Sequence, residues 1–142
     1  MNIIGNGVDI VNNVRIKRSI KNKNFINRIF TKNEIKKSKK LVNKINYFAK
    51  RFAAKEAFVK ALGEGFRNTI NFSDIEVTND KKGKPIINIS NNIKKFLKKK
   101  FKLSKYQIFL SLSDEKKYSI AYVIINKLKW KKNLLSKMLK LF

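Results

Sequence analysis

The chain has 142 residues, with 35 Lys+Arg against 9 Asp+Glu and a formal net charge of +26. Its length fits one ordinary domain, and 43% hydrophobic residues with 11 Phe can build a substantial core. Cysteine and histidine are absent, which excludes disulfides, thiolate metal sites and imidazole catalysis, so any acid–base or metal chemistry must use carboxylates, lysine, hydroxyls or water.

The positive charge predicts an affinity for polyanions, whether nucleic acid, anionic lipid or an acidic protein. Heavy use of Lys, Asn and Ile also fits an A+T-rich genome, so codon bias is an alternative explanation of the excess. No apolar run reaches the length of about 18 residues that a transmembrane helix needs. The opening MNIIGNGVDI lacks the pattern of a signal peptide. We therefore expect a soluble, cytoplasmic protein with no stable membrane insertion.

Residues 3–10, IIGNGVDI, have the alternation expected of a first strand. Gly5, Gly7 and Asp9 share one face of this strand. Two glycines beside a carboxylate leave room for another backbone or a ligand to come close. The alternative is a strand end at which Asp9 only caps or turns the chain.

Residues 12–30 place apolar side chains at helical spacing among several basic ones. The sequence from Thr31 to Glu34 then fits a capping box, which predicts a helix that begins near residue 32. We expect this helix to continue through residues 36–44. Capping is by itself a sufficient structural role for Glu34.

The clearest helix is predicted over residues 46–62, where Ala, Phe, Leu, Lys and Glu are mixed without glycine or proline. Gly63 is expected to end it. Glu56 borders the apolar stripe of this helix, and a carboxylate there is costly unless it is paired or liganded. The alternative is an ordinary surface pair between Glu56 and Lys60, which contributes only about 0.3–0.5 kcal/mol.

The second half of the chain is rich in predicted strands. Residues 74–79 and the segment PIINI after Lys84 alternate on either side of turn residues. A short basic helix is predicted from about 91 to 102. Residues 107–113 and 118–126 are expected to form an antiparallel hairpin.

Residues 127–142 form a basic segment with leucines at helical spacing, which predicts an amphipathic tail. Three roles are open for it: contact with a membrane surface, packing on its own domain, or contact between subunits.

The order of these segments resembles the bacterial holo-acyl-carrier-protein synthases of the 4′-phosphopantetheinyl transferase family. GNGVDIVNNVRI is similar to the family's opening motif, FTKNEI to its short helix start, and KRFAAKEAFVKALGEGF to its most specific signature. FSDIEVTNDKKGKPII and SLSDEKKYSIAYVII resemble its hairpin and closing strands. The match spans residues 1–126 as one transferase domain and leaves 127–142 as the tail. It implies an α+β fold in which a small antiparallel sheet packs with helices.

The resemblance implies an enzyme that transfers 4′-phosphopantetheine from coenzyme A to a serine of apo-acyl carrier protein in fatty acid biosynthesis, releasing 3′,5′-ADP. Asp9 and Glu56 match the family's magnesium ligands, and Glu56 and Lys60 match its catalytic residues. Mg²⁺ commonly takes one or two carboxylates together with phosphates and waters, so this pair would suffice. The base is then a water on the metal or Glu56. The family is usually a trimer with active sites between neighbours, so we expect a homotrimer.

Two further sets of contacts follow from the same resemblance. Those to coenzyme A fall on Arg51, Lys60, Gly63, Gly65 and Asp114. Those to acyl carrier protein fall on Arg15, Arg18, Lys21, Phe25 and Arg28. Acyl carrier proteins are strongly acidic, and complementary charge would speed their encounter with this basic chain.

Two positions depart from the family pattern. Asp114 stands where the family commonly has histidine, and a carboxylate cannot donate a hydrogen bond to a phosphate as imidazolium does. Glu64 occupies the middle of the Gly-x-Gly segment, where it adds repulsion near phosphates unless it points outward.

Two other functions stay open on the sequence. A nucleic-acid-binding module is favoured by the charge, although no RNA-binding motif is present and the lysines are spread along the chain. A catalytically weakened relative that only binds acyl carrier protein is suggested by Asp114 and Glu64. Our own expectation is an enzyme without a nucleic-acid partner.

Overall fold

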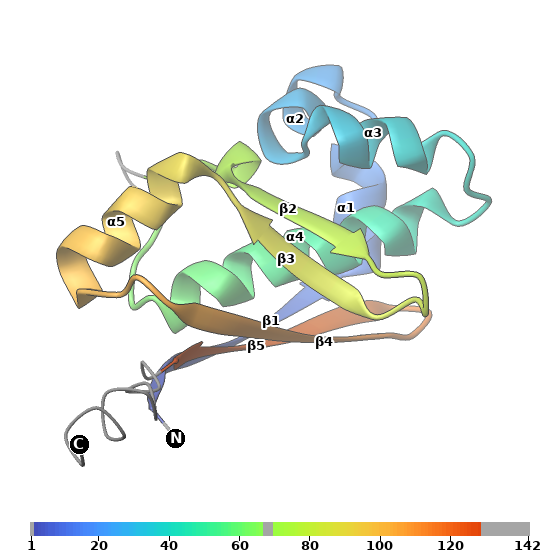
Figure 1. Cartoon of the computed structure of the whole chain (residues 1–142). Helices are drawn as coiled ribbons and strands as arrows, with labels where there is room; N and C mark the ends of the chain where they lie inside the picture. The colour runs from blue at the N-terminus through green and yellow to red at the C-terminus, as the bar shows by residue number, and fades with distance from the viewer. Residues whose placement is uncertain (1, 67–69, 129–142) are drawn as a thin grey trace, which may run out of the picture.

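A computed structural model describes residues 2–66 and 70–128 of the chain (Figure 1). A three-stranded antiparallel sheet has the order β1-β5-β4, and a second, two-stranded sheet pairs β2 with β3. The strands are β1 (Ile3–Asn12), β2 (Ile75–Asn79), β3 (Pro85–Ile89), β4 (Tyr106–Asp114) and β5 (Tyr118–Lys127). The helices are α1 (Asn13–Ser19), α2 (Lys23–Ile29), α3 (Lys32–Ser38), α4 (Lys44–Ala61) and α5 (Asn91–Phe101), with a short 3₁₀ helix η1 (Phe72–Asp74). The predicted α+β class is confirmed.

Helix α4 is the centre of the packing. It lies against β1, β5 and β4 on one side and also contacts β2 and the helices α1 and α3 (Figure 1). Its buried face is dominated by small residues, because Ala49, Ala53, Ala54 and Ala57 have no exposed surface. Small side chains let the helix approach the sheet closely, and this approach sets the geometry of the site.

The glycines of β1 make that approach possible. A Cβ atom on Gly5 would overlap the carbonyl oxygen of Ala61, and one on Gly7 would overlap the carbonyl oxygen of Ala57. The prediction that these glycines leave room for another backbone is confirmed, and the backbone is that of α4. Asp9, on the same face of β1, is thereby carried to the edge of α4.

Most predicted elements form, with one clear error. The strand over 3–10 extends to Asn12, and residues 12–30 hold two short helices, α1 and α2. The expected continuation of a helix through 36–44 is wrong, because α3 ends at Ser38 and α4 begins only at Lys44. Asn43 starts the new helix by accepting a hydrogen bond from the Asn46 backbone N–H at 3.1 Å, as N-cap asparagines do.

A buried ion pair ties five elements together. The Lys55 ammonium group donates to the Glu34 carboxylate at 2.8 Å and to the carbonyl oxygens of Ile29 and Phe72 at 2.7 and 3.1 Å. The other Glu34 oxygen accepts from the Val77 N–H at 2.8 Å. Lys55 is 0% exposed and Glu34 1%. Burial lowers the pKa of Lys55, while the Glu34 carboxylate opposes that shift.

Glu34 therefore has two roles. The predicted capping box with Thr31 is confirmed, and the same side chain is also the counter-ion of Lys55, a partner that the sequence analysis did not identify. No helix among the described residues is long and apolar enough to span a membrane. Residues 129–142, which hold most of the predicted tail, lie outside the described part of the chain.

We expect Gly7→Ala to lower the free energy of unfolding by about 1–3 kcal/mol, because the added methyl group would force β1 and α4 apart. Asn6→Ala, on the opposite and exposed face of β1, should change stability by no more than about 0.5 kcal/mol. Urea denaturation measures both variants. Equal stability of the two would contradict the close packing.

We expect Lys55→Met to cost about 3–5 kcal/mol of stability, because it leaves the Glu34 carboxylate buried and uncompensated. Lys50→Met serves as the matched control. It removes a partly exposed pair with Asp114 and should cost less than about 1 kcal/mol. Thermal or urea unfolding compares the two. The double variant Lys55→Met with Glu34→Gln should be more stable than Lys55→Met alone, and a further loss would argue against this explanation.

Candidate active site

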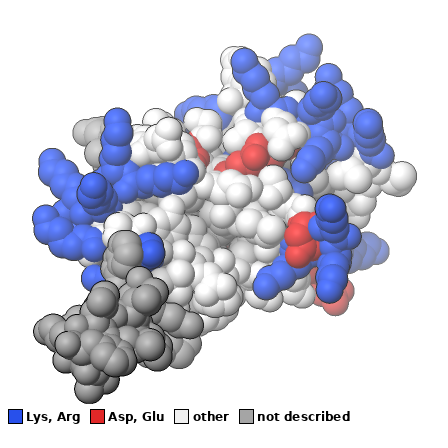
Figure 2. Space-filling model, viewed as in Figure 1, with Lys and Arg blue, Asp and Glu red and all other residues white. Residues whose placement is uncertain are grey.

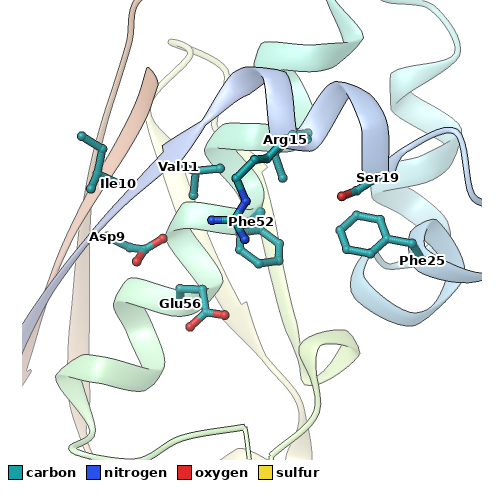
Figure 3. A pocket seen from close by; sticks show the side chains of 9 residues that line it. Asp9, Ile10, Val11, Arg15, Ser19, Phe25, Phe52 and Glu56 are labelled. Carbon is teal, nitrogen blue, oxygen red and sulfur yellow. The ribbon is translucent and has the colours of Figure 1, made fainter. Parts of the chain in front are cut away.

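Asp9 of β1 and Glu56 of α4 line one pocket, and their carboxylates lie on either side of the gap between strand and helix (Figure 3). The pocket has a volume of about 270 Å³. Its other walls come from β1, α1, α2 and α4, through Ile10, Val11, Arg15, Ile16, Ser19, Phe25 and Phe52. The structure thus brings together two acidic residues that are 47 positions apart in the sequence (9 and 56).

Lys60 is the cationic partner of Asp9. Its ammonium group donates to Asp9 Oδ1 at 2.7 Å and to the Val8 carbonyl oxygen at 3.1 Å. Lys60 lies one helical turn after Glu56, but among the described residues it makes its ion pair with Asp9 instead. The simple Glu56–Lys60 surface pair considered from the sequence is therefore not formed. The Lys60 side chain is 54% exposed, so this ammonium group is accessible from solvent.

Glu56 is half-buried and, within the described residues, receives no hydrogen bond from another side chain. Burial raises the pKa of Glu56, the nearby Asp9 raises it further, and Lys60 lowers it. Two carboxylates that share one pocket favour a proton or a cation between them.

This donor set fits a magnesium ion, because hard cations bind carboxylate oxygens and keep several waters or phosphate oxygens as further ligands. No cluster of three or more acidic side chains occurs among residues 2–66 and 70–128. The remaining ligands of a metal held by Asp9 and Glu56 would therefore come from a bound phosphate compound and from water.

Arg51 and Asp114 meet in a different pocket, together with Lys50, Asn46 and Asn79. Arg51 and Glu56 differ by five positions, which places them about 140° apart around α4. The Arg51 guanidinium lies 3.4 Å from the centre of the Tyr47 ring and donates to Asn79 Oδ1 at 3.3 Å. Within one chain, two of the predicted coenzyme A contacts, Arg51 and Asp114, therefore lie in a pocket apart from that of Asp9 and Glu56. Lys60, Gly63 and Gly65 line neither pocket.

Asp114 already has two partners in this second pocket. It accepts from the Lys50 ammonium group and from the Asn46 amide, both at 2.7 Å. The hydrogen bond from Lys50 is the main reason that the pKa of Asp114 is lowered. Asp114 is consequently an ionised carboxylate that holds Lys50 in place. Among the described residues, the buried Nε–H of Arg51 has no hydrogen-bond partner.

Comparison with known proteins decides the family. A model of the 4′-phosphopantetheinyl transferase superfamily matches residues 5–123. The chain is 58% identical over 127 residues to the holo-[acyl-carrier-protein] synthase of Pelagibacter ubique, covering 89% of this chain and 99% of that one. The chain belongs to the 4′-phosphopantetheinyl transferase superfamily.

Solved structures agree with this placement. The crystal structure of the holo-[acyl-carrier-protein] synthase of Neisseria meningitidis superimposes with a TM-score of 0.80 at 38% identity, covering 88% of this chain and 99% of that one. The Bacillus anthracis synthase in complex with CoA (3′,5′-ADP) gives a TM-score of 0.76 at 35% identity, covering 90% and 100%. The resemblance to holo-acyl-carrier-protein synthases is confirmed, and this chain is a phosphopantetheinyl transferase.

The glycine segment of this transferase follows directly on α4. Gly63 has a φ of +67°, a conformation that favours glycine at the end of a helix. Glu64 contacts Lys100 of α5, so its carboxylate is turned towards α5 and neutralised there. Gly65 is exposed. The roles of Gly63 and Gly65 in binding coenzyme A stay predictions.

The side chains predicted to bind acyl carrier protein gather beside the first pocket. Arg15 and Phe25 line that pocket directly, and Figure 3 shows Arg15 reaching into it from α1. Arg18, Lys21 and Arg28 are exposed on α1, α2 and the turn between them. The roles of these five residues in binding acyl carrier protein stay predictions.

Proposed function

We propose that this transferase moves the 4′-phosphopantetheine group of coenzyme A onto a serine of apo-acyl carrier protein, releases 3′,5′-ADP, and serves fatty acid biosynthesis in the cytoplasm. The observation that supports the proposal is the placement of Asp9 and Glu56 in one pocket, with the Lys60 ammonium group bonded to Asp9. The identity of 58% to a holo-[acyl-carrier-protein] synthase supports the choice of substrates.

In the proposed reaction the serine oxygen forms a bond to the phosphorus atom that carries the pantetheine group, and the bond from that phosphorus to the oxygen of 3′,5′-ADP breaks. Asp9 and Glu56 would hold Mg²⁺, which when bound neutralises charge on the diphosphate. Lys60 adds a cation at the same place. Phosphoryl transfer depends mainly on positioning and electrostatic stabilisation, and these three side chains provide both.

The serine proton needs an acceptor close to the attacking oxygen. Glu56 is the candidate that this chain supplies, because it lines the pocket and a base must lie within reach of the proton that it accepts. Asp114 is unsuited to this role, since its oxygens are held by Lys50 and Asn46.

We further propose a homotrimer in which the two pockets of neighbouring subunits combine. The first pocket, at about 270 Å³, is smaller than the 300–1,000 Å³ that ligand sites of drug-sized molecules usually occupy, so coenzyme A needs additional surface. Lys50 and Arg51 bring cationic side chains to the wall of the second pocket, and such groups suit a phosphate.

The outer face of the three-stranded sheet supports the assembly. Val8, Ile10, Phe109, Ile120 and Tyr122 are each between 39% and 60% exposed there. Val8 pairs with Tyr122, and Ile10 pairs with Ile120 across the strands, so these side chains form one apolar surface. Exposed apolar surfaces of this kind mark contacts with other proteins.

Asp9→Asn and Glu56→Gln should each reduce transfer by about 100-fold or more, because each removes a charge that the reaction needs. Glu115→Gln, an exposed carboxylate in the β4–β5 turn, is the matched control and should keep full activity. The assay incubates the full chain with coenzyme A, Mg²⁺ and apo-acyl carrier protein and detects the phosphopantetheine mass gain by mass spectrometry. EDTA should abolish that gain.

Three results would argue against this function. Full activity of Asp9→Asn or Glu56→Gln would remove the metal assignment. Tight carrier-protein binding without transfer would indicate a weakened relative. No transfer together with tight, salt-sensitive RNA binding would favour the nucleic-acid alternative.

The trimer has a separate measurement. Sedimentation equilibrium should give a molar mass three times the 16.6 kDa of one chain. Ile10→Lys places a charge on the apolar surface and should shift the protein towards monomers, whereas Lys36→Gln, on α3, should leave the mass unchanged. A monomeric mass for the unchanged chain would remove the assembly while leaving the family assignment intact.

A further inference from the structure

Helix α5 carries its positive charge on one side. Five exposed lysines follow the spacing i, i+1, i+4, i+5 and i+8: Lys94, Lys95, Lys98, Lys99 and Lys102. At about 100° per residue this spacing keeps the four lysines of α5 within one stripe along the helix, and Lys102 follows at its C-cap, where the backbone is left-handed. We call the five together the α5 lysine stripe. Ile93 and Leu97 lie on the other side and are fully buried. Figure 2 shows the basic side chains gathered over α5.

The stripe has no counter-charge in its own segment, because residues 91–105 contain no Asp or Glu. Lys100 falls outside the stripe and contacts Glu64. Among the described residues, no carboxylate forms a salt bridge with the five lysines of the stripe. Lysines at i and i+4 repel one another along a helix. A bound anionic surface would reduce this repulsion between the ammonium groups of the stripe.

A shallow hollow runs along the stripe. It is lined by Lys95, Lys98, Lys99, Lys102 and the neighbouring Ser104. The wall of the hollow is mainly apolar, so the lysines contribute chiefly their aliphatic stems to it, while their side chains are exposed and leave the charge available to phosphate oxygens. Lysine is a compact, strongly hydrated point charge without the planar fork of arginine. The site therefore fits a surface that carries many phosphates better than a single phosphate held in one orientation.

The chain passes from β5 into its last residues beside this site. The Leu128 backbone N–H donates to the Lys105 carbonyl oxygen at 3.0 Å, just after α5. The sequence of 129–142 then combines further lysines with Trp130 and several leucines, and it contains no carboxylate side chain. Lysines next to Trp and Leu are the composition of segments that bind at a lipid surface.

We propose that the α5 lysine stripe docks this protein on a membrane surface rich in anionic phospholipid, where its ammonium groups meet the headgroup phosphates. The attraction of such a surface increases with each lysine close to it. Single-stranded RNA fits less well, because it binds through exposed aromatic rings, and the two rings of α5, Phe96 and Phe101, are partly buried against the core. The docking is separate from transfer, since the stripe contributes no residue to either pocket of the candidate active site.

The test compares two variants with the same change in net charge. One replaces the stripe: Lys94→Gln, Lys95→Gln, Lys98→Gln, Lys99→Gln and Lys102→Gln. The other replaces exposed lysines of α3, the loop after it and the start of α4: Lys36→Gln, Lys37→Gln, Lys39→Gln, Lys40→Gln and Lys44→Gln. Flotation measures binding of the full chain to vesicles of phosphatidylcholine alone and of phosphatidylcholine with phosphatidylglycerol.

The unchanged chain should bind the vesicles that contain phosphatidylglycerol and leave those of phosphatidylcholine alone. The stripe variant should lose about tenfold or more of that binding and the control variant at most about threefold, with transfer activity and circular dichroism unchanged in both. If the fivefold stripe variant fails to fold, Lys95→Gln with Lys99→Gln is the substitute, and it should still bind less than Lys36→Gln with Lys37→Gln.

Three outcomes overturn the docking surface. The first is an absence of binding to phosphatidylglycerol vesicles. The second is an equal loss in the stripe and control variants, which would show that only net charge matters. The third is tighter binding of an RNA oligonucleotide through the same five lysines, which would assign the stripe to a nucleic acid.

Discussion

The close approach of β1 to α4 determines where the chemistry of this transferase can occur. Gly5 and Gly7 have no side chain to hold the strand away from the helix, and the carbonyl groups of Ala57 and Ala61 occupy the space that a Cβ would need. Asp9 follows on the same face of the strand, and Glu56 precedes Ala57 on the helix. The two carboxylates are therefore placed by backbone packing and do not depend on a flexible loop. A wider spacing between strand and helix would move Asp9 away from Glu56.

The same packing explains why Lys60 pairs with Asp9. One turn beyond Glu56, it reaches across to Asp9 and to the Val8 carbonyl oxygen, so it partly balances one of the two acids of the pocket. The pair joins a half-exposed ammonium group to a largely buried carboxylate, so Lys60 keeps contact with solvent. The structural ion pair of the protein is elsewhere, between Lys55 and Glu34, where both groups are buried. Neighbouring lysines of one helix thus serve different purposes because one faces the core and the other faces solvent.

Much of this arrangement could be predicted from the sequence where local pattern decides it. The β1 glycines, the capping box of Thr31 and Glu34, and helix α4 each carry a signal within a few residues of the feature. The break between α3 and α4 was missed because the helical pattern of the lysines continues, while Asn43 acts through one side-chain hydrogen bond. The partner of Glu34 was missed because lysine is usually a surface residue. Lys55 is buried only by tertiary packing, which its sequence neighbours do not indicate. The separation of Arg51 from Glu56 follows from helical geometry.

The position of the charged side chains says more about the partners of this protein than its net charge does. The net charge of +26 is explained by codon bias as well as by any function. Codon bias does not, however, determine which face of a helix lacks carboxylate side chains. The basic side chains of α1 and α2 adjoin the pocket of Asp9 and Glu56, where an acidic carrier protein would bring its serine. The lysines of α5 line a hollow that neither of the other two pockets shares. The two basic surfaces are separate, so the proposed contact with an acidic carrier protein and the proposed contact with an anionic membrane would not compete.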